Sequence, residues 1–256
     1  MIAYFLSDLH LGAPYFPDSK AAEKRVTDFL DSVKNEADAI FLVGDVLDYW
    51  YEYRYVVPRG FVRFFGKLAE LSDMGVKIVW FIGNHDIWIF DYLPSELGIE
   101  VVDGWKEYSL NGHKFLITHG DGIGKLKPSF KFLRRLFRNR LCQCLFSGIH
   151  PRWTVPFAYN WSRHSRKMDG PSPEDAKRML ANVEDFSKTY LEEHPDVEYF
   201  IYGHLHLLRD IPISSDHGSV RARIIILGEW IAQNSYARWD GARLTLHRYE
   251  EKDPVK

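Results

Sequence analysis

Short apolar runs divide this chain, and each run is followed by a polar motif. The runs are rich in β-branched and aromatic residues, and they cover residues 2–6, 39–43, 76–82, 113–118 and 198–202. Each is short enough for a buried strand rather than a helix. We therefore expect five strands whose ends carry polar groups.

Helical spacing of apolar positions fills the gaps between the first three runs. Residues 18–35 and 58–74 have this spacing, and Gly75 stands where the second helix should end. Alternating strands and helices predict a mostly parallel sheet that is covered by helices. Ligands of such sheets gather beyond the carboxyl ends of the strands, so the polar motifs stand where a site is expected.

Two turn sequences add hairpins to this pattern. An Asn-Gly turn interrupts residues 109–115, and an Asp-Gly turn at residues 240–241 separates two further strand-like stretches. A second, largely antiparallel sheet is the expected result. Residues 173–193 repeat apolar positions at helical spacing up to His194-Pro195, which predicts a helix that packs on the core.

Length and composition fit one globular unit. The 256 residues suit a single large domain, which we assign to residues 1–256, and residues 122–169 are the stretch that could form an insertion within it. A net charge of −2 gives no general bias toward nucleic acid. The sequence gives no indication of an oligomeric state.

The number of cysteines and the sequence at the start of the chain indicate the cellular compartment. Cys142 and Cys144 are the only cysteines, and a lone C-x-C pair makes neither a disulfide framework nor a four-cysteine zinc site. The apolar run that begins at Met1 stops at Asp8, which is too short for a signal peptide, and no run of about 20 apolar residues could span a bilayer. We expect a cytoplasmic protein.

Side chains of metal-ligand type follow all five predicted strands. Asp8 and His10 come after the first, and alternate residues of an extended stretch point to the same face, so both can reach one ion. The complete set consists of Asp8, His10, Asp45, Asn84, His119, His204 and His206. Any one of these motifs alone could be a helix cap, a turn or a satisfied strand end, and only their joint occurrence favours a metal site.

The size of this set favours two metal ions. Seven oxygen and nitrogen ligands exceed the needs of one tetrahedral zinc ion, and a set without thiolate suits manganese, iron or zinc. Two cations about 3.5 to 4 Å apart need an anion between them, and Asp45 is the predicted bridge. The other ligands divide into one group of Asp8, His10 and His206 and a second group of Asn84, His119 and His204.

The motifs "SDLH", "GDVLD", "GNHD", "HGD" and "GHLH" occur in this order, and together they resemble the calcineurin-like metallophosphoesterases. The resemblance implies an α/β (α+β) fold in which a two-sheet β-sandwich is flanked by helices. It also implies that a metal-bridging hydroxide attacks phosphorus in line, with the ligands divided as above. Independently, a bound cation can lower the pKa of water to about 7, which gives hydroxide at neutral pH.

The third motif supplies the candidate catalytic residues Asn84, His85 and Asp86. His85 stands next to a predicted metal ligand, so it could stabilise the transition state or protonate the leaving group, with Asp86 orienting its ring. A purely structural pair of His85 and Asp86 is the alternative.

Basic charge is concentrated in one stretch. Residues 122–168 hold eleven basic residues and no acidic one, although acids outnumber bases in the whole chain by 35 to 33. Apolar residues recur there at helical spacing, as in a helix that meets a membrane or an amphiphile; they are Phe130, Leu133, Phe137, Leu141, Cys144 and Leu145. A core-packed helix with a solvated basic face is the alternative. Nucleic acid could also bind here, but the charge is confined to this insertion, which argues against that partner.

Further features are similar to the UDP-2,3-diacylglucosamine diphosphatase family of lipid A biosynthesis: "GDVLDYW", the basic insertion after "HGD", and "LGEW". The resemblance covers nearly the whole chain. It implies a usually manganese-dependent hydrolase that splits a lipid-linked nucleotide into UMP and 2,3-diacylglucosamine 1-phosphate, with a helical lid over the acyl chains. It also implies a peripheral enzyme whose basic lid meets the anionic cytoplasmic face of the inner membrane of a Gram-negative bacterium.

Two departures from that family are visible. His85 stands where the family usually has arginine, and "GHLH" replaces its frequent G-H-T-H. A related hydrolase of a soluble nucleotide or another phosphoester is therefore an alternative function. A metal-binding scaffold without catalysis is another, but the complete ligand set and His85 argue against it.

The resemblance also suggests substrate contacts. "WSRHSRK", at residues 161–167, is similar to the polar part of the family's lid, which makes Ser162, Arg166 and Lys167 expected contacts of the diphosphate. Asp121 matches the family's acidic residue at the substrate edge of the site, although a turn-forming aspartate is the alternative.

Overall fold

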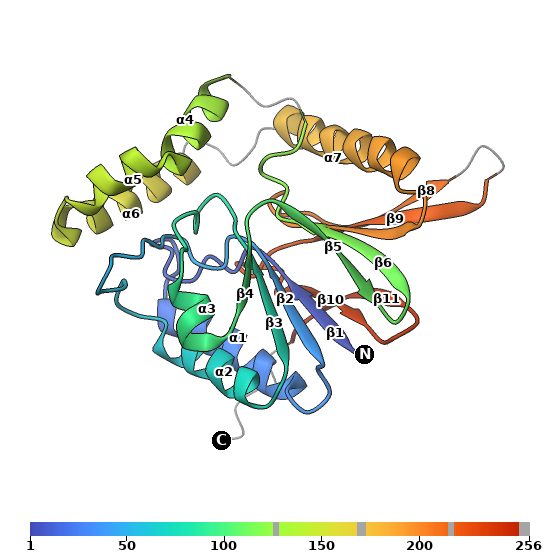
Figure 1. The fold of residues 1–256 in the computed structure, drawn as a ribbon, viewed down its shortest axis with the longest axis horizontal. Coiled ribbons are helices and arrows are strands. Elements are labelled where there is room, and N and C mark those ends of the chain that lie inside the picture. Colours follow the sequence, from blue (N-terminus) through green and yellow to red (C-terminus); the bar gives the residue numbers. More distant parts are fainter. Residues whose placement is uncertain (125–127, 168–172, 215–217, 251–256) are drawn as a thin grey trace.

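Two β-sheets pack face to face, and helices cover their outer faces (Figure 1). The computed structural model describes residues 1–124, 128–167, 173–214 and 218–250, and the side chains of residues 161–167 and 173 lie outside the described part. The predicted α/β sandwich flanked by helices is confirmed.

The first sheet has the strand order β11-β10-β1-β2-β3-β4. Its strands are β1 (Ala3–Leu6), β2 (Ala39–Val43), β3 (Lys77–Phe81), β4 (Glu100–Val102), β10 (Ser235–Trp239) and β11 (Leu244–Arg248). The helices α1 (Ser19–Val33), α2 (Val62–Asp73) and α3 (Tyr92–Leu97) lie between its first four strands in the chain. Because each crossover returns the chain to the same end, β1 to β4 run parallel.

Alternation along β1 gives this sheet two apolar faces. Phe5 points into the core between the sheets and stacks on Phe115 of the second sheet, whereas Leu6 packs in the cluster that α1 shares. A strand that is buried on both faces needs a continuous apolar run. This is why the runs at residues 2–6 and 39–43 are so clear in the sequence.

The second sheet has the order β5-β6-β7-β9-β8. Its strands are β5 (Trp105–Leu110), β6 (His113–Thr118), β7 (Val197–Tyr202), β8 (Leu208–Ser214) and β9 (Val220–Leu227). The expectation of a largely antiparallel sheet is wrong, because β6, β7 and β9 run parallel and only the two outer pairs are antiparallel. The long helix α7 (Pro173–Glu193) causes the difference, since it carries the chain back so that β7 starts at the same end as β6.

Three helices lie together to one side of the sandwich (Figure 1), and we refer to them as the lid. They are α4 (Pro128–Arg138), α5 (Arg140–Ser147) and α6 (Pro151–Lys167). The predicted apolar spacing continues across Asn139, but the helix ends there because the Asn139 side chain accepts hydrogen bonds from the backbone of Leu141 and Cys142 and caps α5. Trp88 anchors the lid to the sandwich, with its ring 5.3 Å from that of Phe137.

Membrane-spanning helices were also sought among the described residues. None of the helices there has both the length and the apolar composition needed to cross a bilayer.

Candidate metal centre

The loops that follow β1, β2, β3, β6 and β7 carry the seven predicted ligands, and six of them, all except Asn84, lie in groups of potential metal-binding side chains. Three groups of side chains there have potential ligand atoms within 4.8 Å of one another. They are Asp8 with His10 and His206; His10 with Asp45 and His85; and Asp45 with His119 and His204. Histidine and carboxylate groups from strands of both sheets therefore converge.

Each carboxylate in this cluster has one oxygen fixed by the backbone and one facing imidazoles. Asp8 Oδ2 accepts hydrogen bonds from Ser7 Oγ at 2.6 Å and from the backbone of His204 at 2.9 Å. Asp8 Oδ1 lies 3.2 Å from His206 Nε2 and 3.7 Å from His10 Nε2. The fixed oxygen sets the orientation, and the other oxygen can serve as a ligand.

Asp45 occupies the middle of the cluster. Its Oδ1 accepts the backbone N–H of His85 at 2.8 Å, while Oδ2 lies 3.8 Å from His10 Nε2 and 3.4 Å from His119 Nε2. His10 and His119 belong to the two different groups of predicted ligands. One oxygen of Asp45 therefore lies within reach of both halves of the centre, which is the geometry that a bridging carboxylate needs.

The donor set fits divalent cations. Two atoms that bind one ion at about 2.0–2.2 Å are at most roughly 4.4 Å apart, and the carboxylate-to-imidazole distances above are all shorter. Among the described side chains, the buried Oδ1 of Asn84 and Nε2 of His119 have no hydrogen-bond partner. Buried polar atoms normally have a partner, so these two are suited to coordination. Oxygen and imidazole donors without thiolate match manganese, iron or zinc.

Outer hydrogen bonds orient the imidazoles. The ring of His119 lies with Nδ1 2.9 Å from the carbonyl oxygen of Val43, and His10 Nδ1 lies 3.3 Å from Asp48 Oδ1. When each Nδ1–H donates to that acceptor, the lone pair of Nε2 points into the cluster, which is how metal-binding histidines are usually held.

The backbone at the ligands is strained in a consistent way. Five of the seven residues have left-handed φ values between 45° and 64°, a region that costs roughly 1 to 3 kcal/mol for residues other than glycine. They are Asp8, His10, Asp45, His204 and His206. Such strain persists only where the surrounding structure imposes it, so the strand ends hold the ligands at the expense of local stability.

Glycines make the close approach of these loops possible. A Cβ on Gly44 would lie 2.4 Å from His119 Nδ1, and one on Gly83 would lie 2.2 Å from Asp45 Oδ1. Neither contact is sterically allowed. The glycines of the "GD" and "GN" motifs are therefore needed so that Asp45 and His119 can pack against the neighbouring loops.

Burial and neighbouring charges shift the pKa values of these groups, in most cases toward the protonation state that binds cations. Burial opposes ionisation of Asp45, but His119 and His85 outweigh it and hold the pKa of Asp45 well below 3.8. Burial, aided by the nearby His119, lowers the pKa of His204 to about 4, so its imidazole is neutral at pH 7. His119 is the exception: burial opposes its charge, but Asp45 outweighs that effect and raises its pKa well above 6.5.

The third motif forms different contacts from those expected. The carboxylate of Asp86 accepts hydrogen bonds from the backbone of Gly83 and Val46 and from Trp80 Nε1, at 2.7 to 3.1 Å. The expectation that Asp86 orients His85 is therefore wrong, because its oxygens bind the loop backbone instead. Burial and the adjacent charge of Asp45 raise the pKa of Asp86 to about 6.

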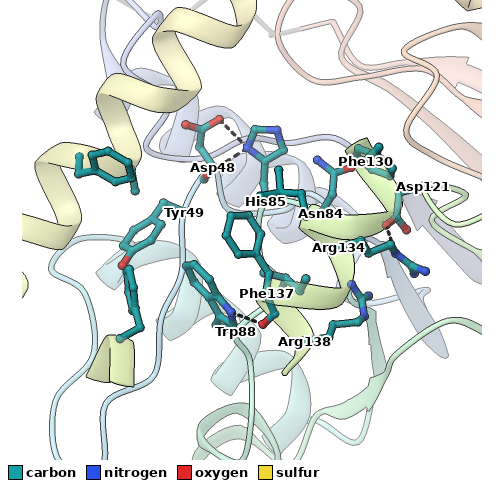
Figure 2. A pocket seen from close by; sticks show the side chains of 15 residues that line it. Asp48, Tyr49, Asn84, His85, Trp88, Asp121, Phe130, Arg134, Phe137 and Arg138 are labelled. Atoms are coloured by element: carbon teal, nitrogen blue, oxygen red, sulfur yellow. Dashed lines mark hydrogen bonds and ion pairs between the residues drawn. The ribbon is translucent and has the colours of Figure 1, made fainter. Parts of the chain in front are cut away.

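Asp48 contacts the ring of His85 in place of Asp86. His85 Nδ1 lies 3.1 Å from the carbonyl oxygen of Asp48 and 3.5 Å from its Oδ1 (Figure 2). Asp48 also contacts His10, so one buried carboxylate positions both imidazoles. Sequence reasoning missed this residue, although it is the last position of the "GDVLD" motif.

A cavity of about 460 Å³ opens beside Asn84 and His85 (Figure 2). Most of its wall is apolar and comes from the lid and from the loop after β3, including Ile87, Trp88, Phe130, Leu133, Phe137, Phe146 and Phe157. Polar groups occur on the same wall, among them the predicted contact residue Asp121. Two arginines of α4, Arg134 and Arg138, also line it; sequence reasoning counted them among the basic residues of the insertion but did not predict them as contacts.

The remaining predicted substrate contacts are placed only by their backbone. Ser162, Arg166 and Lys167 belong to the last turns of α6, and their side chains lie outside the described part of the structure. Their role as contacts of the diphosphate stays a prediction.

Comparison with known proteins agrees with this geometry. A family model described as calcineurin-like phosphoesterase matches residues 1–208. A protein named UDP-2,3-diacylglucosamine hydrolase from Porphyromonas gingivalis is 43% identical over 262 residues, covering 98% of both chains. Proteins of the same name from Neisseria meningitidis and Shewanella putrefaciens are 28% and 27% identical and cover 92% of this chain and 91% of theirs. This chain therefore belongs to the calcineurin-like phosphoesterase family.

Proposed function

We propose that this protein hydrolyses the pyrophosphate of UDP-2,3-diacylglucosamine and releases UMP and 2,3-diacylglucosamine 1-phosphate. The observation that carries the proposal is the apolar cavity under the lid, which opens beside Asn84 and His85 of the candidate metal centre. An acyl chain would fill such a cavity with apolar surface, whereas the base of a soluble nucleotide has polar edges that an apolar wall leaves unpaired. The name and near-complete overlap of the Porphyromonas relative support the same substrate.

The size of the cavity suits an acyl chain. Its volume of about 460 Å³ lies within the range of small-molecule sites. A second apolar cavity of about 310 Å³ shares Trp88, Phe137 and Phe146 with it and extends between α4 and α5. Each buried methylene contributes about 0.8 kcal/mol, so ten methylenes contribute about 8 kcal/mol to binding. Acyl burial can therefore select a lipid-linked substrate.

Divalent metals are a property of the family, and we propose two manganese ions for this protein, with iron or zinc suited to the same donors. Asp8, His10 and His206 would hold one ion, Asn84, His119 and His204 the other, and Asp45 would bridge them. When bound, the ions would lower the pKa of water toward 7 and neutralise charge on the phosphate.

The chain's own residues would position the substrate around that chemistry. Desolvation lowers the pKa of His85, so at neutral pH its ring contributes hydrogen bonds rather than a fixed charge, unlike an arginine at this position. Asp48 keeps the ring facing the cavity through contacts of 3.1 and 3.5 Å. We propose Ser162, Arg166 and Lys167 as further contacts of the diphosphate and Asp121 as a contact at its edge.

We also propose that the lid docks on an anionic membrane, on the cytoplasmic face of the inner membrane. Several large apolar side chains of the lid are exposed, among them Leu141 at 68%, Leu145 at 67% and Trp153 at 71%. Basic residues such as Arg140 and Arg152 are exposed beside them in the chain. Each basic residue near an anionic leaflet contributes about 1 kcal/mol, so the lid combines charge with apolar insertion.

The direct test is release of UMP from UDP-2,3-diacylglucosamine by the manganese-loaded protein in detergent. We expect rapid release by the wild type and a loss of at least about 10³-fold in His10→Ala, because one metal loses a ligand. His247→Ala, which removes an exposed histidine of β11, is the matched control and should keep full activity. No UMP release, together with turnover of bis(p-nitrophenyl) phosphate, would instead indicate a phosphoesterase for soluble substrates.

A further inference from the structure

The cavity face of α4 combines apolar and cationic side chains. Residues spaced by three and four positions lie on one face of a helix, and those that line the cavity are Phe130, Leu133, Arg134, Phe137 and Arg138. The wall is mostly apolar but also carries polar side chains, among them Asn84, Asp121 and the two arginines. Acyl binding alone does not account for the arginines, whereas an anionic group that enters the same cavity would.

Arg134 is held in place by the sandwich. Its Nε lies 3.1 Å from Oδ2 of the buried Asp121 and donates a hydrogen bond to it (Figure 2). The guanidinium also packs against Gly122, where a Cβ would lie 2.8 Å from both Nη1 and Nη2. A side chain at position 122 would displace Arg134, so this loop leaves room for the guanidinium.

Arg134 is connected to the candidate metal centre through Asp121, which accepts a hydrogen bond from its Nε. Asp121 follows His119 by two positions, and its charge acts on both His119 and His204. Asn84 and His85 line the same cavity as Arg134. The four N–H groups of Nη1 and Nη2 can donate to a phosphate, because Asp121 is bound through Nε.

We propose that Arg134 binds the phosphate that stays with the lipid, the leaving group of the hydrolysis. This inference rests on the proposed function. The phosphate nearest the acyl chains must lie between the metal centre and the apolar part of the cavity, and Arg134 is a fixed cation in the wall of that cavity. A guanidinium suits this task because its planar donors match two phosphate oxygens at once.

The contact between Arg134 and the leaving phosphate would assist cleavage of the phosphorus–oxygen bond. Water adds to the uridylyl phosphorus, the bond from that phosphorus to the bridging oxygen breaks, and its electron pair remains on the lipid-side phosphate. The protons of the water pass to solvent or to the product phosphates. Arg134 stabilises the charge that develops on the leaving phosphate, so its effect is larger in the transition state than in the bound substrate.

The first experiment compares Arg134→Gln with Arg135→Gln on two substrates. Arg135 is exposed, lies on the same helix and does not line the cavity. Arg135→Gln therefore removes the same charge without removing a side chain from the cavity wall. We expect Arg134→Gln to lower kcat for UDP-2,3-diacylglucosamine by roughly 10²-fold, with little change in KM. Hydrolysis of bis(p-nitrophenyl) phosphate, whose leaving group has no phosphate, should change by less than about threefold. Arg134→Lys should recover part of the loss.

The second experiment measures binding without catalysis. Calorimetry on the manganese-loaded protein compares dodecyl phosphate with dodecanol, which share the apolar tail. Arg134→Gln should weaken binding of dodecyl phosphate by at least tenfold and leave dodecanol unchanged, whereas Arg135→Gln should alter neither.

The outcomes separate the alternatives. If Arg134 only fastens the lid, its loss weakens dodecanol and dodecyl phosphate alike, which overturns the proposal. Equal losses on both phosphate substrates overturn it as well, because they indicate damage to the metal centre. If the wild type releases no UMP, the proposed function fails, and the binding comparison still decides whether Arg134 recognises a lipid-side phosphate.

Discussion

Asp45 shows how single residues carry the chemistry of this centre. Its backbone adopts a left-handed φ of 50°, one oxygen is fixed by the N–H of His85, and the other lies within 3.8 Å of imidazoles from both halves of the cluster. Sequence reasoning predicted Asp45 as the bridging ligand, and this role stays a prediction. It could not predict that Asp48, rather than Asp86, contacts His85, because that contact joins positions 37 residues apart and depends on how two loops pack.

His119 leads to a prediction on pH. The carboxylate of Asp45 raises the pKa of His119 well above 6.5 against the opposing effect of burial, so without metal its imidazole is protonated at pH 7. A metal ion must displace that proton. We expect manganese affinity to rise with pH by up to about tenfold per unit, with one proton released per protein from this histidine.

Calorimetry in buffers of different ionisation enthalpy measures that release. The control is His247→Ala, which should show the same proton release as the wild type. An affinity that does not change between pH 6.5 and pH 8 would contradict the prediction.

At the scale of elements, strand ends were the most predictable part. The bounds of β2 and β6 agree with the predicted runs 39–43 and 113–118, because β2 and the central part of β6, Phe115 to Ile117, are fully buried and need uninterrupted apolar sequence. The hairpin of β8 and β9 was missed. β8 lies at the edge of its sheet, where charged residues and Pro212 are tolerated, so its sequence carries no clear strand signal.

The lid is the element whose outer face should meet the membrane. Leu141 on α5 and Trp153 on α6 are both largely exposed and line neither apolar cavity. We expect the double variant Leu141→Ser with Trp153→Ser to bind vesicles containing phosphatidylglycerol roughly 10- to 100-fold more weakly, because two side chains no longer insert.

Sedimentation of vesicles with the protein measures that affinity. Val62→Ser removes an equally exposed apolar side chain from α2 on the sandwich and is the matched control. Hydrolysis of bis(p-nitrophenyl) phosphate should be unchanged in all three proteins. Equal vesicle binding by the wild type and the double variant would show that another surface docks on the membrane.

At the scale of the whole molecule, both sheets supply residues to the candidate metal centre. β1, β2 and β3 deliver Asp8, Asp45 and Asn84 from one sheet, while β6 and β7 deliver His119, His204 and His206 from the other. The ligands meet because the core between the sheets, which includes Phe5 stacked on Phe41 and Phe115, fixes their relative position. The motifs named the carboxylate and imidazole groups that lie close together. The packing of α4 against the sandwich depends on contacts such as that of Trp88 with Phe137, which no local pattern reveals.

The most direct measurement is anomalous scattering from crystals grown with manganese. The account predicts two peaks about 3.5 to 4 Å apart, with the carboxylate of Asp45 in contact with both, His10 beside one and His119 beside the other. A single peak, or a pair of peaks that Asp45 does not touch, would contradict it.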